Sequence, residues 1–455
     1  MHTGLRWIED NTPGLVALAQ AIWEYAELGL KEERSAAAQA EYLRKEGFDV
    51  QLGVAGMPTA LVASWGQGKP AIGYLGEYDA LPGLSQKAVA RQEPVQEGGS
   101  GHGCGHNLLG VGSLAAAVAL KQEMEGRPGV VCYYGCPAEE THDAKALMAL
   151  HGLFDALDAA ITWHPAALNA PSYASSLAMN SVRFAFHGRA AHAAGAPHLG
   201  ISALDGVELM NVGVNYLREH VIQDARIHYV ITHGGGQPNV VPEYAEVWYY
   251  VRAPRRQDVE EIYQRIIKVA EGASLMSGAR LEVKLESGTH EYVPNAVITG
   301  VMEQSLRQVG PPQFSAEERA FARELESSFS PGGKLAVLRA GATPPEYWGL
   351  TLHEGVAPAF DRGKVIHGST DVADVSWVVP TGQITAATWG LGTAGHSWQV
   401  TAASGMGIGH RGMIVAAKAM ALAGYELLTH PDLVQRAREA FLADTDGRPY
   451  VSPLA

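Results

Sequence analysis

The segment Gly-Ser-Gly-His-Gly-Cys-Gly-His-Asn, residues 99–107, places one thiol and two imidazoles in a run of glycines. A backbone so rich in glycine can turn tightly and can aim Cys104 and His106 at one point. A thiol and an imidazole two residues apart, on a loop that opens an apolar helix, make half of a metal site. Because a glycine run by itself is more often a flexible turn, the assignment depends on further ligands elsewhere in the chain.

Four acidic or histidine side chains come shortly after predicted strands in the first half of the chain. They are Asp79 after Ile72–Leu75, Glu139 and Glu140 after Val131–Tyr134, and His164 after Ile161–Trp163. Since ligands of open α/β sheets bind at the carboxyl ends of the strands, we expect these side chains to lie close together. His396 is a further candidate in the C-terminal part. A single histidine is more often structural than a ligand, so the prediction rests on the whole set.

The adjacent acids Glu139 and Glu140 end a buried strand within Gly-Cys-Pro-Ala-Glu-Glu. Two carboxylates without compensating charge would be costly there, and a bound metal removes that cost. Adjacent residues project in different directions, so one can bind the metal while the other reaches the water that the metal activates. A Lewis acid beside a general base is the arrangement that metal-dependent hydrolysis needs.

The composition is that of an ordinary globular enzyme with an acidic balance. Among 455 residues, 47% are hydrophobic and 18% are charged, and 34 Lys and Arg against 48 Asp and Glu give a net charge of −14. Without a basic cluster, nucleic acid is not expected as a partner. Three cysteines are too few for a disulfide framework, and neither a signal-like start nor an uninterrupted membrane-length apolar stretch is present. We therefore expect a cytoplasmic protein without a membrane partner.

The length favours two domains, and the order of the predicted elements separates them. In the first part, as in a buried α/β sheet, we expect strands at 61–65, 71–75, 130–134 and 159–163 and helices at 15–28, 34–45, 108–123 and 144–150. From residue 181 the order becomes β-α-β-β-α-β, with strands near 182–186, 227–232, 245–251 and 281–285 and helices at 203–220 and 259–273. This second order is the ferredoxin-like split unit.

The first domain resumes near Pro294 and ends in helices at 412–427 and 433–442. We therefore divide the chain into a larger domain of residues 1–180 and 293–455 and an inserted domain of residues 181–292. The stretch 328–365 is rich in Gly and Pro, and no element is predicted for it.

Several motifs together resemble the metal-dependent aminoacylase and carboxypeptidase superfamily. They are Gly-Glu-Tyr-Asp-Ala-Leu-Pro-Gly-Leu-Ser at 76–85, Gly-His-Gly-Cys-Gly-His-Asn-Leu-Leu-Gly at 101–110, Pro-Ala-Glu-Glu and Trp-His-Pro. The motifs at 368–377 and 396–399 narrow the resemblance to the amidohydrolase branch that includes the p-aminobenzoyl-glutamate hydrolases. The resemblance implies an α/β, mixed-sheet, metallopeptidase-like catalytic domain and an inserted ferredoxin-like α+β domain that serves as lid and dimerisation domain.

Carried over position by position, the resemblance implies a divalent metal centre of one or two ions, zinc or manganese. Its ligands would be Cys104, His106, Glu140, His164 and His396, with Glu139 as the general base. Many relatives have a His-x-Asp ligand motif where this chain has Glu77-Tyr78-Asp79, so the resemblance makes Asp79 a support for the ligands. Relatives also often have glycines where Thr141-His142-Asp143 follow the glutamate pair, and a surface position is our interpretation of His142.

Three residues of the inserted domain, His192, Asn239 and Arg252, match the lid motifs of the family. The resemblance implies that His192 polarises the oxyanion of the tetrahedral intermediate and that Asn239 and Arg252 bind a substrate carboxylate. It also implies a homodimer, or a heteromer with a related chain.

The resulting hypothesis is a metal-dependent amidohydrolase that cleaves the linear amide bond of a small N-acyl amino acid, with a p-aminobenzoyl-glutamate-like substrate favoured. Two alternatives stay open. In the first, the chain is a non-catalytic or co-catalytic subunit of a hetero-oligomeric amidohydrolase. In the second, the same metal site removes an amino group from an aromatic ring by hydrolysis. A dinucleotide-binding fold is not expected, because neither 98–105 nor 405–409 forms a G-x-G-x-x-G fingerprint in a strand–turn–helix unit.

Overall fold

The computed structural model describes residues 2–455, which divide into two compact units. The larger unit holds the chain up to Ala174 together with Val293–Lys364 and Val375–Tyr450. The smaller unit holds Ser175–Tyr292, and the segments Val365–Asp374 and Val451–Ala455 group with it.

The larger unit is built on one mixed sheet of seven strands. They are β1 (Asp49–Leu52), β2 (Leu61–Gln67), β3 (Ala71–Glu77), β4 (Gly129–Cys136), β5 (Ala159–Ala166), β6 (Ala170–Ser172) and β11 (Thr381–Ala387). Their order is β1-β2-β4-β3-β5-β11-β6, in which β4, β3, β5 and β11 are parallel and the pairs β1–β2, β2–β4 and β11–β6 are antiparallel. The carboxyl ends of the four parallel strands therefore meet at one edge of the sheet.

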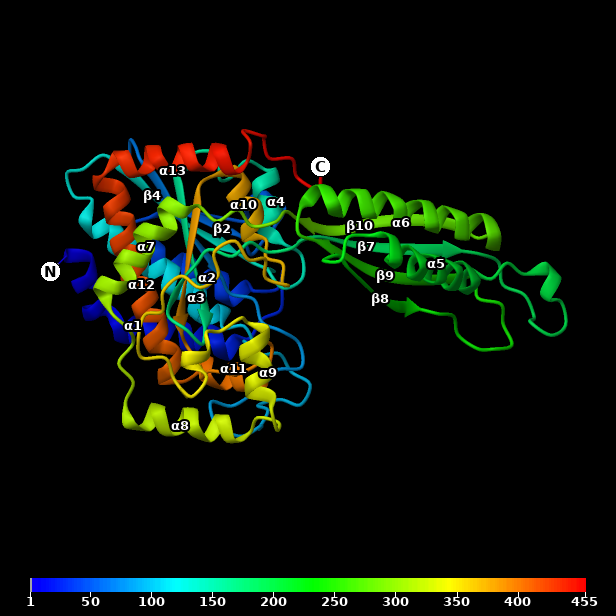
Figure 1. Cartoon of the computed structure of the whole chain (residues 1–455), viewed down its shortest axis with the longest axis horizontal. Coiled ribbons are helices and arrows are strands. Elements are labelled where there is room, and N and C mark those ends of the chain that lie inside the picture. The colour runs from blue at the N-terminus through cyan, green and yellow to red at the C-terminus, as the bar shows by residue number, and fades with distance from the viewer. Residues whose placement is uncertain (1) are drawn as a thin grey trace. The chain divides into compact units, whose positions relative to one another are not determined.

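The chain that builds this sheet also forms a set of helices (Figure 1). They are α1 (Thr3–Tyr25), α2 (Glu33–Lys45), α3 (His106–Glu123), α4 (Ala144–Leu150), α7 (Ala296–Val309), α8 (Ala316–Ser327), α9 (Gly333–Ala340), α10 (Val372–Val378), α11 (Trp398–Ser404), α12 (Gly407–Thr429) and α13 (Pro431–Asp444). The helices α3 and α12 pack on each other, α3 also packs on β3, β4 and β5, and α12 packs on β5 and β11. Their apolar side chains form the main core together with Tyr74 and Trp163. This packing holds the start of α3 beside the sheet.

The helix α12 is long and apolar enough to cross a membrane if only length and composition are considered. However, 72% of its most apolar window is buried inside the protein. A helix that is apolar on all sides and surrounded by protein is a core helix, and α12 has that role here.

The smaller unit pairs four antiparallel strands with two helices. Its elements are β7 (Ala178–His187), α5 (Ala203–Leu217), β8 (Arg226–His233), β9 (Tyr244–Ala253), α6 (Arg256–Ser277) and β10 (Arg280–Thr289), with the strand order β10-β7-β9-β8. Both helices contact β7 and β9 and lie on one face of the sheet (Figure 1). Burial alternates along β9, so Val247, Tyr249 and Val251 face the helices while Glu246 and Trp248 lie on the open face.

The expected fold class, a mixed α/β sheet with an inserted ferredoxin-like α+β unit, is confirmed. The boundaries of individual elements differ in places. The first helix begins at Thr3 and ends at Tyr25, whereas 15–28 was expected, because it accommodates Pro13 in its interior. The stretch 328–365 contains α9 and a short 3-10 turn at Pro345–Tyr347. The strand β11, with the sequence TGQITAA, is short and lacks the apolar run that would have predicted it.

Candidate metal centre

The candidate residues of the larger unit lie where its parallel strands end. Asp79 follows β3, Glu139 and Glu140 follow β4, His164 lies near the end of β5, and His396 follows β11. Cys104 and His106 come from the glycine-rich loop, and His106 is the first residue of α3. Gly105, just before it, has φ of 76°, a conformation that glycine adopts without strain. The sheet and the start of α3 therefore bring seven side chains of distant sequence positions to one edge.

Three groups of possible donor atoms form there among the described residues, and two of them share Cys104. The ligand atoms of Cys104, His106 and His164 lie within 4.8 Å of one another, and so do those of Cys104, Glu140 and His396. The two groups that share Cys104 could hold one or two divalent ions, with the Cys104 sulfur within reach of either position. Thiolate, imidazole and carboxylate ligands favour a transition metal such as zinc over magnesium or calcium.

Asp79 fixes the orientation of the His106 imidazole. The ring Nδ1 lies 2.8 Å from Asp79 Oδ1, and because a carboxylate oxygen accepts, Nδ1 carries the proton and donates it. The other oxygen of Asp79 accepts the backbone N–H of Glu140 at 3.0 Å. The lone pair of a neutral His106 ring is therefore on Nε2, which is the carboxylate–histidine arrangement found at metal sites.

The His164 ring is oriented in the same way by the backbone. Its Nδ1 lies 2.7 Å from the carbonyl oxygen of Pro165, which can only accept, so Nδ1 donates and Nε2 holds the lone pair. That Nε2 lies 3.6 Å from the sulfur of Cys104. His396 Nε2 lies 3.2 Å from Glu140 Oε1. Each of the two groups thus has an imidazole nitrogen beside an anionic partner.

The electrostatics of these side chains favour the charged forms. Burial alone would raise the pKa of the Cys104 thiol, but the imidazoles of His106 and His164 outweigh burial and bring that pKa down to about 6. Contacts with Cys104 and Glu140 raise the pKa of His396 to about 10. The anionic side chains of the site therefore need positive charge beside them, and protonated imidazoles supply it here. A divalent metal could supply that charge instead, because metal binding displaces the protons from the imidazoles.

Several buried ligand atoms of the site lack hydrogen bonds, as expected of atoms that bind a metal. Among the described residues, Glu77 Oε2, His106 Nε2 and Glu140 Oε1 are buried atoms without a hydrogen bond. Buried polar atoms are nearly always paired, so three orphaned donors at one place call for a partner. Metal binding at the neighbouring donor groups would give these atoms partners, since each has a lone pair to offer.

Backbone strain surrounds the glutamate pair and one of the histidines. Ala138, just before Glu139, has φ of 54°, Asp143 has φ of 50° and His396 has φ of 52°. Non-glycine residues in this left-handed region cost roughly 1–2 kcal/mol each. Such strain is typically retained where a precise side-chain direction matters, as it would for a ligand and a base.

Two buried side chains of this site were not predicted from the sequence. Glu77 Oε2 lies 3.2 Å from His106 Nε2, and Glu77 Oε1 lies 2.6 Å from the ammonium nitrogen of Lys145. The side chain of Lys145 is 0% exposed and that of Glu77 is 2% exposed. A lysine in the first turn of the otherwise apolar helix α4 was the available signal, because a buried lysine requires an anionic partner.

Glu32 is a further buried carboxylate of the larger unit. It accepts the backbone N–H of Ala138 at 2.8 Å and the hydroxyl of Thr59 at 3.0 Å. Burial nevertheless raises its pKa from 4.5 to about 7. The folded protein therefore holds this proton more tightly than the unfolded chain does. The resulting stabilisation is complete below about pH 4.5 and is lost as the pH rises through about 7.

The three residues assigned to the lid lie in the smaller unit. His192 is exposed, and its Nδ1 accepts the backbone N–H groups of Ala194 at 3.2 Å and Gly195 at 3.0 Å. Since Nδ1 accepts, the proton of the neutral ring is on Nε2, which can donate to an anion. Asn239 is exposed, and its carbonyl accepts the N–H of Ala193 at 3.0 Å. Arg252 is half-buried, with a guanidinium nitrogen 3.3 Å from the hydroxyl of Ser369.

His142, in the segment that departs from the family pattern, is exposed, and its ring contacts the hydroxyl of Thr141 at 2.8 Å. This agrees with the surface position expected from the sequence. The neighbouring Asp143 is 6% exposed.

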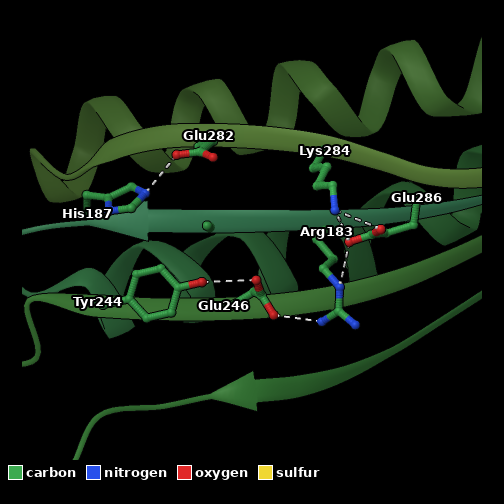
Figure 2. Close-up of a pocket in the computed structure, with 8 residues that line it drawn as sticks. Arg183, His187, Tyr244, Glu246, Glu282, Lys284 and Glu286 are labelled. Atoms are coloured by element: carbon green, nitrogen blue, oxygen red, sulfur yellow. Dashed lines mark hydrogen bonds and ion pairs between the residues drawn. The ribbon is translucent and has the colours of Figure 1, made fainter.

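A second polar cluster lies on the open face of the four-stranded sheet, around a pocket of about 330 Å³ (Figure 2). Arg183 pairs with Glu246 at 2.7 Å and with Glu286 at 2.9 Å, and Lys284 pairs with Glu286 at 3.0 Å. The charges thus compensate one another on an open surface. Pairs of this kind contribute about 0–1 kcal/mol, and we assign no chemistry to them.

Comparison with known proteins agrees with this geometry. A relative from Escherichia coli (strain K12), which is a subunit of p-aminobenzoyl-glutamate hydrolase, is 41% identical, and the alignment covers 98% of this chain and 96% of that protein. Residues 176–275 match the peptidase dimerisation domain of the M20 family. The chain belongs to the M20 family.

Two further M20-like proteins extend the comparison. The Xaa-Arg dipeptidase of Mus musculus is 28% identical over 95% of this chain and 90% of its own length. A dinuclear metal-binding peptidase of the M20 family from Bacillus subtilis has the same fold, with a TM-score of 0.60 at 16% identity over 92% of this chain and 99% of that one. The chain is accordingly a metal-dependent amidohydrolase that uses a divalent metal.

Proposed function

We propose that this M20 protein hydrolyses the amide bond of N-acyl amino acids with a free α-carboxylate and that p-aminobenzoyl-glutamate is its first substrate to test. The observation that carries the proposal is the pair of donor groups sharing Cys104, with Glu139 and Glu140 beside them. The 41% identity to a p-aminobenzoyl-glutamate hydrolase chain supports the choice of substrate.

In this proposal the ligands divide between two positions. Cys104, His106 and His164 hold one ion, and Cys104, Glu140 and His396 hold the other. Zinc and manganese are the candidate metals, and when bound they supply Lewis acidity toward the amide carbonyl and the attacking water. Asp79 keeps the His106 ring in the orientation that directs Nε2 to the metal.

Glu139 is the proton carrier of the reaction. It follows the strained residue Ala138 and belongs to a donor group with His106 and Glu77. Its carboxylate accepts a proton from the attacking water and then delivers it to the leaving nitrogen, so one residue serves both steps. The ring of His192 donates from Nε2 to the oxyanion of the tetrahedral intermediate.

The smaller unit supplies substrate recognition and assembly in this proposal. Asn239 and Arg252 bind the α-carboxylate of the substrate, Arg252 through its planar guanidinium. The protein forms a dimer through residues 181–292, as a homodimer or with a related chain, and His192 acts in the site of the neighbouring subunit. The match to a dimerisation domain supports assembly, and the expected location is the cytoplasm.

The experiment is a substrate comparison with the metal-reconstituted protein. Turnover of p-aminobenzoyl-glutamate is measured by mass spectrometry beside its α-carboxamide and a panel of other N-acyl amino acids. We expect the free acid to be cleaved and the α-carboxamide to be a poor substrate. Arg252→Lys should lower kcat/KM for the acid by an amount equivalent to roughly 2–5 kcal/mol, because it removes one partner of a desolvated carboxylate pair.

Arg255→Lys is the matched control, because Arg255 is an exposed arginine three residues away that pairs with Asp258. It should leave the turnover unchanged. Efficient cleavage of the carboxamide, or equal behaviour of the two variants, would contradict the carboxylate anchor.

The two alternative functions predict different products and partners. A non-catalytic chain gives no turnover without a second chain. We keep this alternative because the Escherichia coli relative is one subunit of its hydrolase. An aromatic deaminase releases ammonia and leaves the amide bond intact. Turnover by the purified chain with release of glutamate is the outcome that our proposal requires.

A further inference from the structure

A pocket of about 500 Å³ in the larger unit includes none of the candidate residues of the metal centre. Its walls come from α1, the end of α7, the connection between α7 and α8, the start of α8 and the first half of α12. Small-molecule sites typically occupy roughly 300–1,000 Å³. The pocket is therefore large enough for a small organic ligand, and its lining indicates which kind.

Much of the lining is apolar. Val16 on α1, Val309 at the end of α7 and Ile414 on α12 line the pocket, and Pro311 and Pro312 line it from the connection to α8. The first three side chains pack against the main core but are only partly buried. A ligand that covered them would remove apolar surface from water, which favours binding. The ligand should therefore have an apolar body.

The helix α12 adds two cations to this pocket. Arg411 and Lys418 are seven residues apart and lie on the same face of the helix. Arg411 Nε donates to both oxygens of Glu318, at 2.9 and 2.7 Å, and the two terminal nitrogens of Arg411 make no hydrogen bond with any described residue. The ammonium of Lys418 has three protons, and Glu9 engages it at 2.7 Å. Both cations therefore keep donors for a ligand.

The acidic side chain of the pocket is already engaged. Glu318 is the one carboxylate among the described residues of the lining, and it is 8% exposed. Besides Arg411, it accepts the backbone N–H of Ser315 at 2.6 Å. A ligand amine would have to compete with these donors, whereas a ligand anion meets free ones. Because the charge of Glu318 remains close by, a single negative charge fits better than two.

His410 brings a polar atom without a partner to the same wall. It lines the pocket, and its Nε2 is buried and has no hydrogen bond among the described residues. Burial lowers the pKa of this imidazole to about 4, so the ring is neutral near pH 7. Since buried polar atoms are nearly always paired, the unpaired nitrogen indicates an environment that a ligand could complete.

We propose that this pocket is a second ligand site of the protein and that its ligand is a monocarboxylate with an apolar body, such as an aryl carboxylate. The free edge of the Arg411 guanidinium binds the carboxylate, because the two planar groups match in geometry. Lys418 supplies the second positive charge, and the apolar body lies against Val16, Val309 and Ile414. The site is separate from the metal centre, and the inference does not depend on the proposed hydrolysis.

The test is a calorimetric titration of the metal-reconstituted protein with naphthoate and with its neutral carboxamide. We expect the acid to bind and the carboxamide to bind roughly 10-fold more weakly, because it loses charge-assisted hydrogen bonds. Arg411→Gln should weaken the binding of the acid by a similar factor, and Lys418→Gln should act in the same direction. Ile414→Phe, which fills part of the apolar wall, should weaken the binding of both compounds.

Arg319→Gln is the matched control. Arg319 lies on α8, its side chain is 41% exposed against 46% for Arg411, and it also pairs with a glutamate, Glu354, but it does not line the pocket. This variant should bind naphthoate as the wild type does. Arg411→Lys keeps a positive charge beside Glu318 if Arg411→Gln folds poorly, and it should still bind naphthoate more weakly because it lacks the planar guanidinium.

A second titration distinguishes this pocket from the catalytic site, which is also expected to bind carboxylates. If Arg252→Gln abolishes the binding of naphthoate and Arg411→Gln leaves it unchanged, the compound occupies the catalytic site and the inference is wrong. It is also wrong if naphthoate does not bind at millimolar concentration, if the acid and the carboxamide bind equally, or if Arg411→Gln behaves like Arg319→Gln. Two binding events, of which Arg411→Gln weakens one, would support it.

Discussion

The substitution Asp79→Asn tests how much of the metal affinity comes from a residue that does not touch the metal. Asp79 uses both carboxylate oxygens, one for the Nδ1 proton of His106 at 2.8 Å and one for the backbone N–H of Glu140 at 3.0 Å. It thereby orients one expected ligand of each ion. An asparagine of the same shape has only one oxygen for these two donors.

The loss can be worked out from the two possible orientations of the amide. If the NH₂ group faces His106, the ring must move its proton to Nε2, where it blocks the metal. If the NH₂ group faces Glu140, two donors meet and the peptide must shift. Since removal of such supporting partners typically costs 10–100-fold in metal affinity, we expect a loss of about 1.4–2.7 kcal/mol.

The assay is a competition titration of zinc against a chromophoric chelator at fixed neutral pH. Asp158→Asn is the matched control, because Asp158 also accepts a backbone N–H, that of Ala71 at 2.7 Å, but belongs to none of the donor groups. The control should bind zinc as the wild type does. Zinc affinity of Asp79→Asn within twofold of the wild type would refute the supporting role.

Three further predictions follow from the same structure. Cys104 should resist alkylation until the metal is chelated, and the charge-transfer band of cobalt-substituted protein should be absent in Cys104→Ser; equal alkylation with and without chelator would contradict this. Mixing inactive His192→Ala with inactive Glu139→Gln protein should restore part of the activity, because hybrid dimers hold one complete site; no recovery despite proven subunit exchange would place His192 elsewhere. Glu32→Gln should become more stable relative to the wild type by up to about 3 kcal/mol between pH 5 and pH 8, measured by urea unfolding, because the wild-type carboxyl loses its proton as the pH rises through about 7. A pH-independent difference would show that the raised pKa of Glu32 is wrong.

The sequence was sufficient for the fold class and for the convergence of the candidate ligands. The alternation of strands and helices predicted a buried α/β sheet, and ligands of such sheets bind at the carboxyl ends of the strands. Asp79, Glu140 and His164 follow or lie near the ends of β3, β4 and β5. In the structure Glu140 and His164 each lie in a donor group with Cys104, and Asp79 contacts His106.

The buried pair of Glu77 and Lys145 could not be predicted in the same way. Its partners come from the end of β3 and the start of α4, and only the packing of these two elements shows that they meet. Each residue alone has an ordinary interpretation, a strand-end acid and a helix-surface lysine. A pairing between distant positions is a property of the tertiary structure, and composition and periodicity do not contain it.

Some secondary structure was also missed for identifiable reasons. The helix α8 begins with a capping box, in which the Ser315 hydroxyl accepts the N–H of Glu318 and the Glu318 carboxylate accepts the N–H of Ser315. That Ser-x-x-Glu spacing was available as a signal. By contrast, residues 365–374 and 451–455 group with the smaller unit although they are far from it in the sequence. This grouping depends on tertiary contacts, and sequence patterns of neighbouring residues do not predict such contacts.

The most direct test of the account compares Glu139→Gln with Glu140→Gln by metal analysis and turnover of the purified protein. We predict that Glu139→Gln keeps its metal and loses at least ~10²-fold in turnover, because it removes the general base. Glu140→Gln should lose metal as well as activity, because it removes a ligand that lies beside His396. If Glu139→Gln lost the metal while Glu140→Gln kept it, the two roles would be reversed, and if both variants stayed active, the proposed mechanism would be wrong.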